Sequence, residues 1–242
     1  MKAKLLIVFL VLLSAFMGCK DKDSVSAANK YLSYVDNDDG VRLIEFEYDE
    51  QKRMKKINVF LYQDPVEIRI VYDEQGRVKD CFLETVQVGY QYNANGVLSG
   101  FTFMGGTVGV YYDPVVRKYT LSLGGSTYNY YFDEKGHLIR VEDLNLLYDN
   151  GKGPLHNVDI PPALTLAPYG VFLDVFVENN FLSAPLESIL GGSGSNPANI
   201  SFENTYEKDG FLKRSLKTVK SYESGQLNME MFSYNYHYIS LK

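Results

Sequence analysis

The sequence has little of what marks several common functional classes. Its 242 residues include no Trp, 2 Cys and 3 His, which are too few for a disulfide framework or a zinc cluster. It also has no excess of basic residues, because 24 Lys and Arg stand against 30 Asp and Glu and give a net charge of −6. A protein that follows nucleic-acid phosphates would carry a basic surface. We therefore expect no nucleic-acid partner.

The N-terminal hydrophobic run is too short to span a membrane. It covers Leu5 to Leu13 and follows Lys2 and Lys4, whereas a membrane helix needs about 20 apolar residues. A basic start followed by a short apolar run is typical of a secretory signal peptide. Residues 1–18 are therefore predicted to be a signal peptide that is removed on export.

The end of this segment, Phe16-Met17-Gly18-Cys19, resembles a bacterial lipobox. The resemblance implies that Cys19 is acylated and that residues 19–39 form a lipid anchor and tether. Lys20-Asp21-Lys22-Asp23 resembles the export signal of surface-exposed Bacteroidetes lipoproteins, although an ordinary polar linker explains the same charges. We expect lipid anchoring at the outer membrane, with cell-surface exposure left open.

Tyrosine is abundant, with 20 residues, and much of it belongs to an internal repeat. Five segments alternate apolar and other residues, reach an aromatic anchor, and continue with Asp or Asn. The anchors, spaced by 24, 20, 20 and 20 residues, are Tyr48, Tyr72, Tyr92, Tyr112 and Phe132. Short alternating segments rich in Val, Ile and Tyr are typical of strands with one buried face.

A turn follows each anchor. Asp73 to Gly76, Asn93 to Gly96 and Asp133 to Gly136 place an Asx residue first and Gly fourth, as a type I turn with a following left-handed residue requires. Apolar residues return six and nine positions after the anchor. These offsets differ by an odd number, so we expect β-bulges beside several turns. The first unit has Lys52 in place of Gly and the fourth, Asp113 to Arg117, has no Gly, which predicts distorted or longer loops.

The repeat resembles the tyrosine-aspartate (YD) unit of bacterial Rhs-type proteins, most closely in Tyr72-Asp73-x-x-Gly76-Arg77-Val78. Dozens of such units form a shell around a cargo there, but this chain has at most eight, so we do not expect that function. A closer resemblance, over residues 40–242, is to uncharacterised Bacteroidetes lipoproteins built from the same hairpins. It implies an antiparallel barrel-like sheet and supplies no activity.

Residues 150–199 interrupt the repeats. They hold six of the 8 prolines and the glycines of Gly191 to Gly194, so regular strands are not expected. Residues 169–181 and 184–190 are each predicted to form a short helix. This insertion either plugs one end of the sheet or acts as a lid over a ligand pocket.

Patterns for catalysis, metals or cofactors are not found. Gly191 to Ser195 lacks the second glycine of a nucleophile elbow, and Asp36 to Gly40 lacks the Gly and Glu positions of an EF-hand. Acids such as Glu74 and Glu134 suit exposed hairpin tips better than a glycosidase pair. Cys81, in an alternating segment, is expected to be buried and inert. We expect a non-enzymatic protein without a metal or cofactor.

Three tyrosines form the candidate binding patch. Tyr111 and Tyr131 each precede an anchor and are out of phase with the buried face, and Tyr119 is a third candidate. On a solvent-exposed face these rings suit a glycan or a protein partner, whereas in a sheet covered on both sides they are core.

The predicted fold is an all-β antiparallel meander of about 12–16 strands, curved or closed into a barrel-like sheet, with a short helical insertion. It forms a single domain over residues 40–242. The predicted function is a non-enzymatic envelope lipoprotein that binds a glycan or partner protein through a sheet face. The alternative is a carrier that holds a hydrophobic small ligand inside the barrel under the insertion.

Overall fold

A computed structural model describes residues 29–60, 65–166, 181–185, 199–223 and 226–241. These contain 17 strands and one short helix, α2 (Pro162–Thr165). The strands are β1 (Lys30–Asp36), β2 (Arg42–Tyr48), β3 (Met54–Val59), β4 (Val66–Tyr72), β5 (Val78–Leu83), β6 (Val86–Tyr92), β7 (Leu98–Phe103), β8 (Gly106–Asp113), β9 (Lys118–Leu123), β10 (Ser126–Phe132), β11 (Leu138–Val141), β12 (Leu144–Asn145), β13 (Leu147–Tyr148), β14 (Phe181–Pro185), β15 (Asn199–Tyr206), β16 (Leu212–Glu223) and β17 (Gln226–Ser240). The all-β prediction is confirmed. Within the described ranges, no helix has the length and apolar character that crossing a membrane requires.

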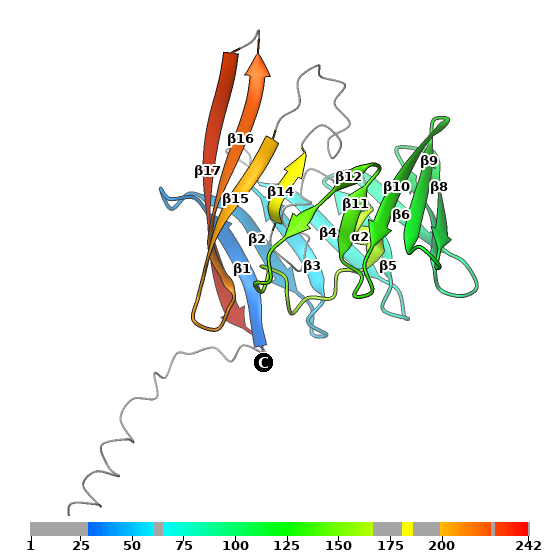
Figure 1. Cartoon of the computed structure of the whole chain (residues 1–242). Coiled ribbons are helices and arrows are strands. Elements are labelled where there is room, and N and C mark those ends of the chain that lie inside the picture. The colour runs from blue at the N-terminus through cyan, green and yellow to red at the C-terminus, as the bar shows by residue number, and fades with distance from the viewer. Residues whose placement is uncertain (1–28, 61–64, 167–180, 186–198, 224–225, 242) are drawn as a thin grey trace, which may run out of the picture.

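The strands form one curled antiparallel sheet (Figure 1). From β1 to β11 each strand pairs with its successor, and β14 to β17 do the same. β17 then pairs with β1, with Lys30 opposite Ser240. On the other side the two halves meet at two-residue strands, where β12 pairs with β11 and β13 pairs with β14. Counting β12 and β13 as one strand interrupted at Leu146 agrees with the predicted number.

The Asp-x-x-Gly turns are built as the sequence predicts. In the second unit, Oδ1 of Asp73 accepts hydrogen bonds from the backbone N–H groups of Gln75 and Arg77, each at 2.9 Å. Gly76 takes the left-handed φ of 79°. Nε of Arg77 donates to the second carboxylate oxygen of Asp73 at 2.8 Å. The predicted bulges are confirmed, because the register shifts at the anchors Tyr48, Tyr72, Tyr92 and Phe132.

The anchor tyrosines couple each unit to the one before it. Three hydroxyl groups donate to an earlier backbone carbonyl oxygen over 2.7–2.8 Å: Tyr48 to Leu32, Tyr72 to Met54 and Tyr92 to Val78. The guanidinium carbon of Arg77 lies 4.5 Å from the ring centre of Tyr92, close enough for a cation–π contact. Burial raises the pKa of Tyr92 to about 12, so its hydroxyl stays a proton donor. The repeat therefore uses Tyr for its hydroxyl as well as for its apolar ring.

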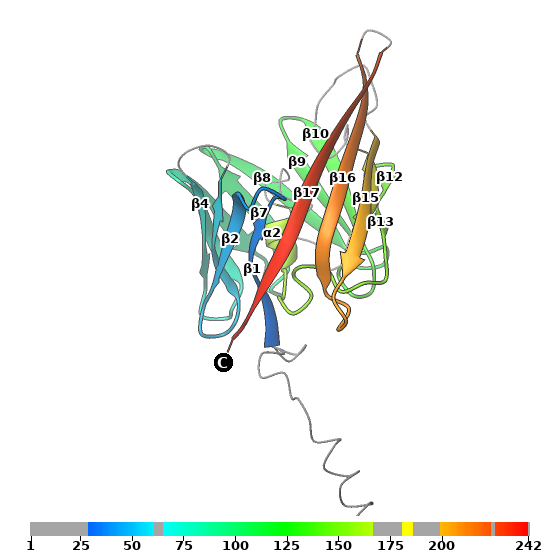
Figure 2. The same cartoon turned by 90° about the vertical axis from the view of Figure 1, so that its left-hand side faces the viewer.

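The core lies on the concave face of the sheet. Ile70, Cys81 and Val88 are opposite one another on successive strands and are buried. Leu155 and Leu164, from the first part of the predicted insertion, are buried in the same cluster. Both views place α2 within the curl (Figure 2). The start of the insertion thus fills part of the space that the sheet encloses.

The sheet begins earlier than predicted. β1 pairs with β17 on one side and β2 on the other, so it lies inside the segment 19–39 that was expected to be a tether. The sequence does hold the signal, because Asn37 to Gly40 repeats the Asx-x-x-Gly turn. The Gly40 N–H donates to the Asn37 carbonyl oxygen at 3.0 Å, as in the other turns. The predicted domain boundary at residue 40 is therefore wrong.

The insertion contains a strand, although its prolines had led us to expect no regular strand there. β14 pairs with β13 and β15, so a helix that starts at Ala184 is wrong. Its proline, Pro185, is tolerated because it lies at the end of the strand. The short helix α2 lies before both predicted helices. Residues 167–180 and 186–198, which hold most of the two predicted helices and Gly191 to Ser195, lie outside the described residues.

The two loops without glycine differ from each other. In the first, Lys52 takes a left-handed φ of 64° and its backbone N–H donates to the Asp49 carbonyl oxygen at 2.9 Å, so the standard turn is kept and the expected distortion is wrong. In the fourth, Arg117 takes the left-handed conformation, with φ of 51°, and Asp113 pairs with Lys118 without a register shift. The expected distortion is confirmed there.

Candidate functional site

Two of the three candidate tyrosines share the convex face of the sheet. Tyr111 on β8 lies opposite Thr120 on β9, and Tyr131 on β10 lies opposite Lys118. Thr120 and Lys118 are two residues apart on one strand, so they point to the same side. Tyr111 and Tyr131 therefore lie on one face, in adjacent rows. Tyr111 is 66% exposed.

Tyr119 does not join them. It is 8% exposed and packs in the core against the rings of Tyr112 and Phe132, with centroids 4.5 and 5.5 Å away. The unbulged fourth loop explains this position. Without a register shift, positions seven and nine after the anchor, Tyr119 and Leu121, face the core together. In a bulged unit, positions six and nine face the core instead, as Val78 and Cys81 do.

The neighbours of these two rings are polar. The Arg140 guanidinium carbon lies 3.6 Å from the ring centre of Tyr131 and covers part of it. Between the two tyrosines, the Thr120 hydroxyl donates to Oδ1 of Asn129 at 2.9 Å. The Asn129 side-chain amide donates to Glu142 at 3.2 Å. These groups hold one another in place and leave Tyr111 as the most exposed ring.

The floor beside Tyr111 is bare backbone. Gly109 lies two residues earlier on β8, so it faces the same side, and it is opposite Gly100 on β7. A Cβ atom at Gly109 would meet nothing within 4 Å, which means that the space above this residue is open. Glycine inside a strand often allows another molecule to approach the backbone closely. The convex face of β7–β10 thus offers an exposed ring, an open floor and polar side chains.

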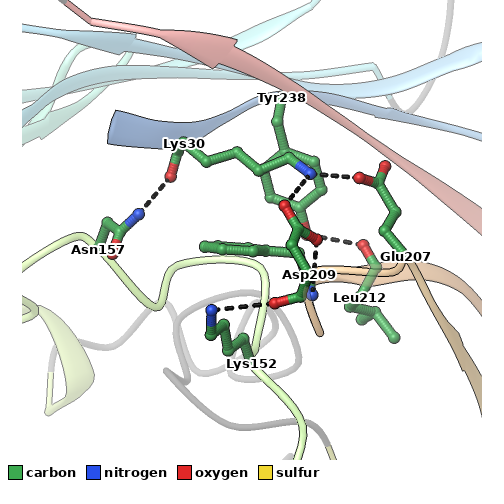
Figure 3. A network of polar contacts seen from close by, with 8 residues as sticks. Lys30, Lys152, Asn157, Glu207, Asp209, Leu212 and Tyr238 are labelled. Carbon is green, nitrogen blue, oxygen red and sulfur yellow. Dashed lines mark hydrogen bonds and ion pairs between the residues drawn. The ribbon is translucent and has the colours of Figure 1, made fainter. Parts of the chain in front are cut away.

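A second cluster, which sequence reasoning missed, joins the two ends of the chain (Figure 3). The Lys30 ammonium group is buried and pairs with the carboxylate of Glu207 and with Oδ2 of Asp209, the latter at 2.9 Å. It also lies 5.1 Å from the ring centres of Phe211 and Tyr238. Strand β1, the turn between β15 and β16, and strand β17 meet at this one cation.

The insertion reaches the same junction. The Asn157 side-chain amide donates to the Lys30 carbonyl oxygen at 2.8 Å, and Nζ of Lys152 donates to the Asp209 carbonyl oxygen at 2.9 Å. We call these residues, with Glu207, the Lys30 junction. It therefore ties the insertion to both ends of the sheet.

The charges at the junction are fixed. Burial opposes the charged form of Lys30, but its hydrogen bonds and proximity to Glu207 and Asp209 outweigh burial and raise its pKa. Burial likewise opposes the charged form of Asp209, yet the bonds from Lys30 and the Phe211 backbone lower its pKa. A lysine whose charged form is favoured by two carboxylates is a poor general base. The junction is therefore a structural contact.

A variant of the repeat turn makes this contact possible. The Glu207 N–H donates to the Phe211 carbonyl oxygen at 2.8 Å, and the Gly210 N–H donates to the Glu207 carbonyl oxygen at 3.0 Å. These are the backbone bonds of the Asp-x-x-Gly turns, with Glu in the Asp position. Glu is one methylene longer, so its carboxylate extends out of the turn to Lys30. Glu-x-x-Gly after the aromatic Tyr206 is the sequence signal that was missed.

The other candidates are placed as follows. Cys81 is buried, and Cys19 lies outside the described residues. Asp36 to Gly40 covers the last residue of β1 and the turn after it, where Asp38 pairs with Arg214 at 2.6 Å. In the part of the chain that the structure covers, no three His, Cys, Asp or Glu side chains gather where they could hold a metal ion.

Comparison with known proteins gives a family match. The family model described as Teneurin YD-shell matches residues 23–164, more than half of the chain. A solved structure described as a porin-like protein from Bacteroides uniformis has 11% sequence identity and a TM-score of 0.41, and the alignment covers 89% of this chain and 99% of that one. No curated protein matches. The predicted YD repeats are thereby confirmed by an independent sequence model.

Proposed function

We propose that this chain, which belongs to the Teneurin YD-shell family, is a non-enzymatic envelope lipoprotein that binds a glycan through the convex face of β7–β10. One observation carries the proposal: Tyr111 exposes 66% of its surface beside the open floor at Gly109. A flat apolar ring with a hydroxyl suits stacking against a sugar. The neighbouring polar groups of Asn129 and Glu142 suit its hydroxyls.

Packing inside the curl favours this proposal over the hydrophobic-ligand carrier. Leu155, Leu164 and Leu166 of the insertion are buried in the core cluster. They occupy part of the space that a ligand under the insertion would need. The convex face has no such cover among the described residues near Tyr111.

Glycan binding is tested on an array of bacterial surface and plant cell-wall polysaccharides, followed by titration of the polysaccharide that binds best. We expect Tyr111→Ala to weaken binding by about tenfold, because it removes the stacking ring. Tyr128→Ala is the matched control, since Tyr128 is 41% exposed but lies opposite Leu121, on the other face. Equal losses in both variants, or no binding on the array, would contradict the proposal.

Lipid attachment is tested in the same producing cells. The Cys19→Ser chain should fail to incorporate a labelled fatty acid and should no longer remain with the outer membrane. Labelling that persists in this variant would refute the anchor and leave glycan binding untouched.

A further inference from the structure

The hairpin of β16 and β17 extends past the rest of the sheet (Figures 1 and 2). The two strands stay paired from Arg214 opposite Asn235 to Glu223 opposite Gln226. β1 pairs with β17 only as far as Asn235. Just beyond that point, the Asp38 N–H donates to the Ser233 hydroxyl at 3.2 Å. Among the described strands, none covers the outer edge of β17 from residue 226 to residue 232.

This edge lacks the usual protection against pairing. Natural edges commonly carry Lys, Pro or a bulge, but residues 226–232 contain a single charge, Glu230, and pair with β16 without a register shift. Leu227, Met229 and Met231 alternate along the strand, so they share one face. All three are more than half exposed.

The order of side chains fits a second copy of the same edge. We infer that two chains pair antiparallel through β17 about a two-fold axis at Met229. Leu227 then lies opposite Met231 of the other copy, which joins the two apolar stripes on one face. On the other face Asn228 lies opposite Glu230, an amide beside a carboxylate. Centring the axis on Glu230 instead would place two glutamates directly opposite each other, which is unfavourable.

The orientation of the hairpin determines what the pair would link. Its last described pair, Glu223 and Gln226, lies at the end of the sheet away from the C-terminus (Figure 1) and from Lys30, which pairs with Ser240. Antiparallel pairing therefore places the Lys30 ends of the two copies at opposite ends of the dimer. Chains held by a lipid before Lys30 would pair between facing surfaces. Seven paired residues per copy form a small interface, so we expect a weak dimer.

The first test is sedimentation equilibrium of the full chain in mild detergent, from about 1 µM to about 1 mM. We expect a concentration-dependent dimer, which Met229→Lys weakens by at least about tenfold because two like charges meet at the axis. Met104→Lys is the matched control, since Met104 is 77% exposed in the turn between β7 and β8. A monomer at every concentration, or equal weakening by both variants, would overturn the inference.

The second test fixes the register. Met229→Cys should form a disulfide between copies on mild oxidation, because the Cα atoms of directly opposite residues are about 4.5–5.5 Å apart, within the range that a disulfide spans. Met231→Cys should not, because residue 231 lies opposite Leu227. The parent chain, with Cys19 and the buried Cys81, gives the background. A cross-link at position 231 without one at position 229 would overturn the proposed register.

Discussion

The regular hairpins of β2–β7 and the closing hairpins of β15–β17 share one turn backbone and use it differently. In the regular turns, the Asp carboxylate bonds within its own turn, as between Asp73 and Arg77. In the closing turn, Glu207 stands in the Asp position and its carboxylate reaches Lys30, 177 residues away. Glu is one methylene longer than Asp, and this length lets the same turn bind a distant strand instead of only its own residues.

The largest effect on stability is expected where the closing hairpins of β15–β17 meet β1. Lys30→Ala should lower the free energy of unfolding by about 2–3 kcal/mol, because it removes a largely buried partner and leaves Glu207 and Asp209 close together without their cation. Urea denaturation measures this change. Lys56→Ala is the control in the regular hairpins, where the partly exposed pair with Glu47 should contribute less. Equal losses would mean that the junction contributes no more than a surface pair.

The dependence of stability on pH tests the same junction. The pKa of Asp209 is lowered in the folded chain, so its contribution to stability is present above its unfolded pKa of about 3.9 and is lost as the pH falls through the folded value. The Asp209→Asn chain should therefore lose less stability than the parent chain between about pH 5 and pH 2. Identical acid profiles in the two chains would contradict this linkage.

A smaller effect on stability is expected in the regular hairpins of β2–β7. Tyr72→Phe removes the hydroxyl that donates to the Met54 carbonyl oxygen at 2.7 Å, and should lower the free energy of unfolding by about 1 kcal/mol. Tyr111→Phe serves as a comparison, because its exposed hydroxyl should contribute almost nothing. If both variants unfold alike in urea, the hydrogen bonds from the anchor tyrosine hydroxyls do not stabilise the repeat.

The smallest expected effect is an increase in stability. Lys52 holds a left-handed φ of 64° in the first turn, and Lys52→Gly should raise the free energy of unfolding by about 0.5–1 kcal/mol by relieving that conformation. Lys55→Gly on β3, where no left-handed φ occurs, should instead destabilise. A thermal melt of both variants distinguishes them, and a loss at position 52 would refute the strain.

The repeat could be predicted because its signals are local. The Asx-x-x-Gly spacing and the odd offset after each anchor indicate turns and bulges within about ten residues of chain. The contact between β1 and β17 depends instead on pairing across nearly the whole sequence, and Lys30 alone does not indicate it. Tyr119 was misplaced because the fourth turn lacks the bulge that sets the face of the residues after it.

The hydrogen bonds from the anchor tyrosine hydroxyls also suggest the order in which the hairpins fold. Tyr48, Tyr72 and Tyr92 each bond to a carbonyl that precedes them by 16, 18 and 14 residues. Each new hairpin can therefore dock on one already made, with short loops to close. β1 must wait for β17, the last of the 17 described strands to emerge during synthesis, before its second edge is covered. Until then the growing sheet has two open edges, and the final strand completes it.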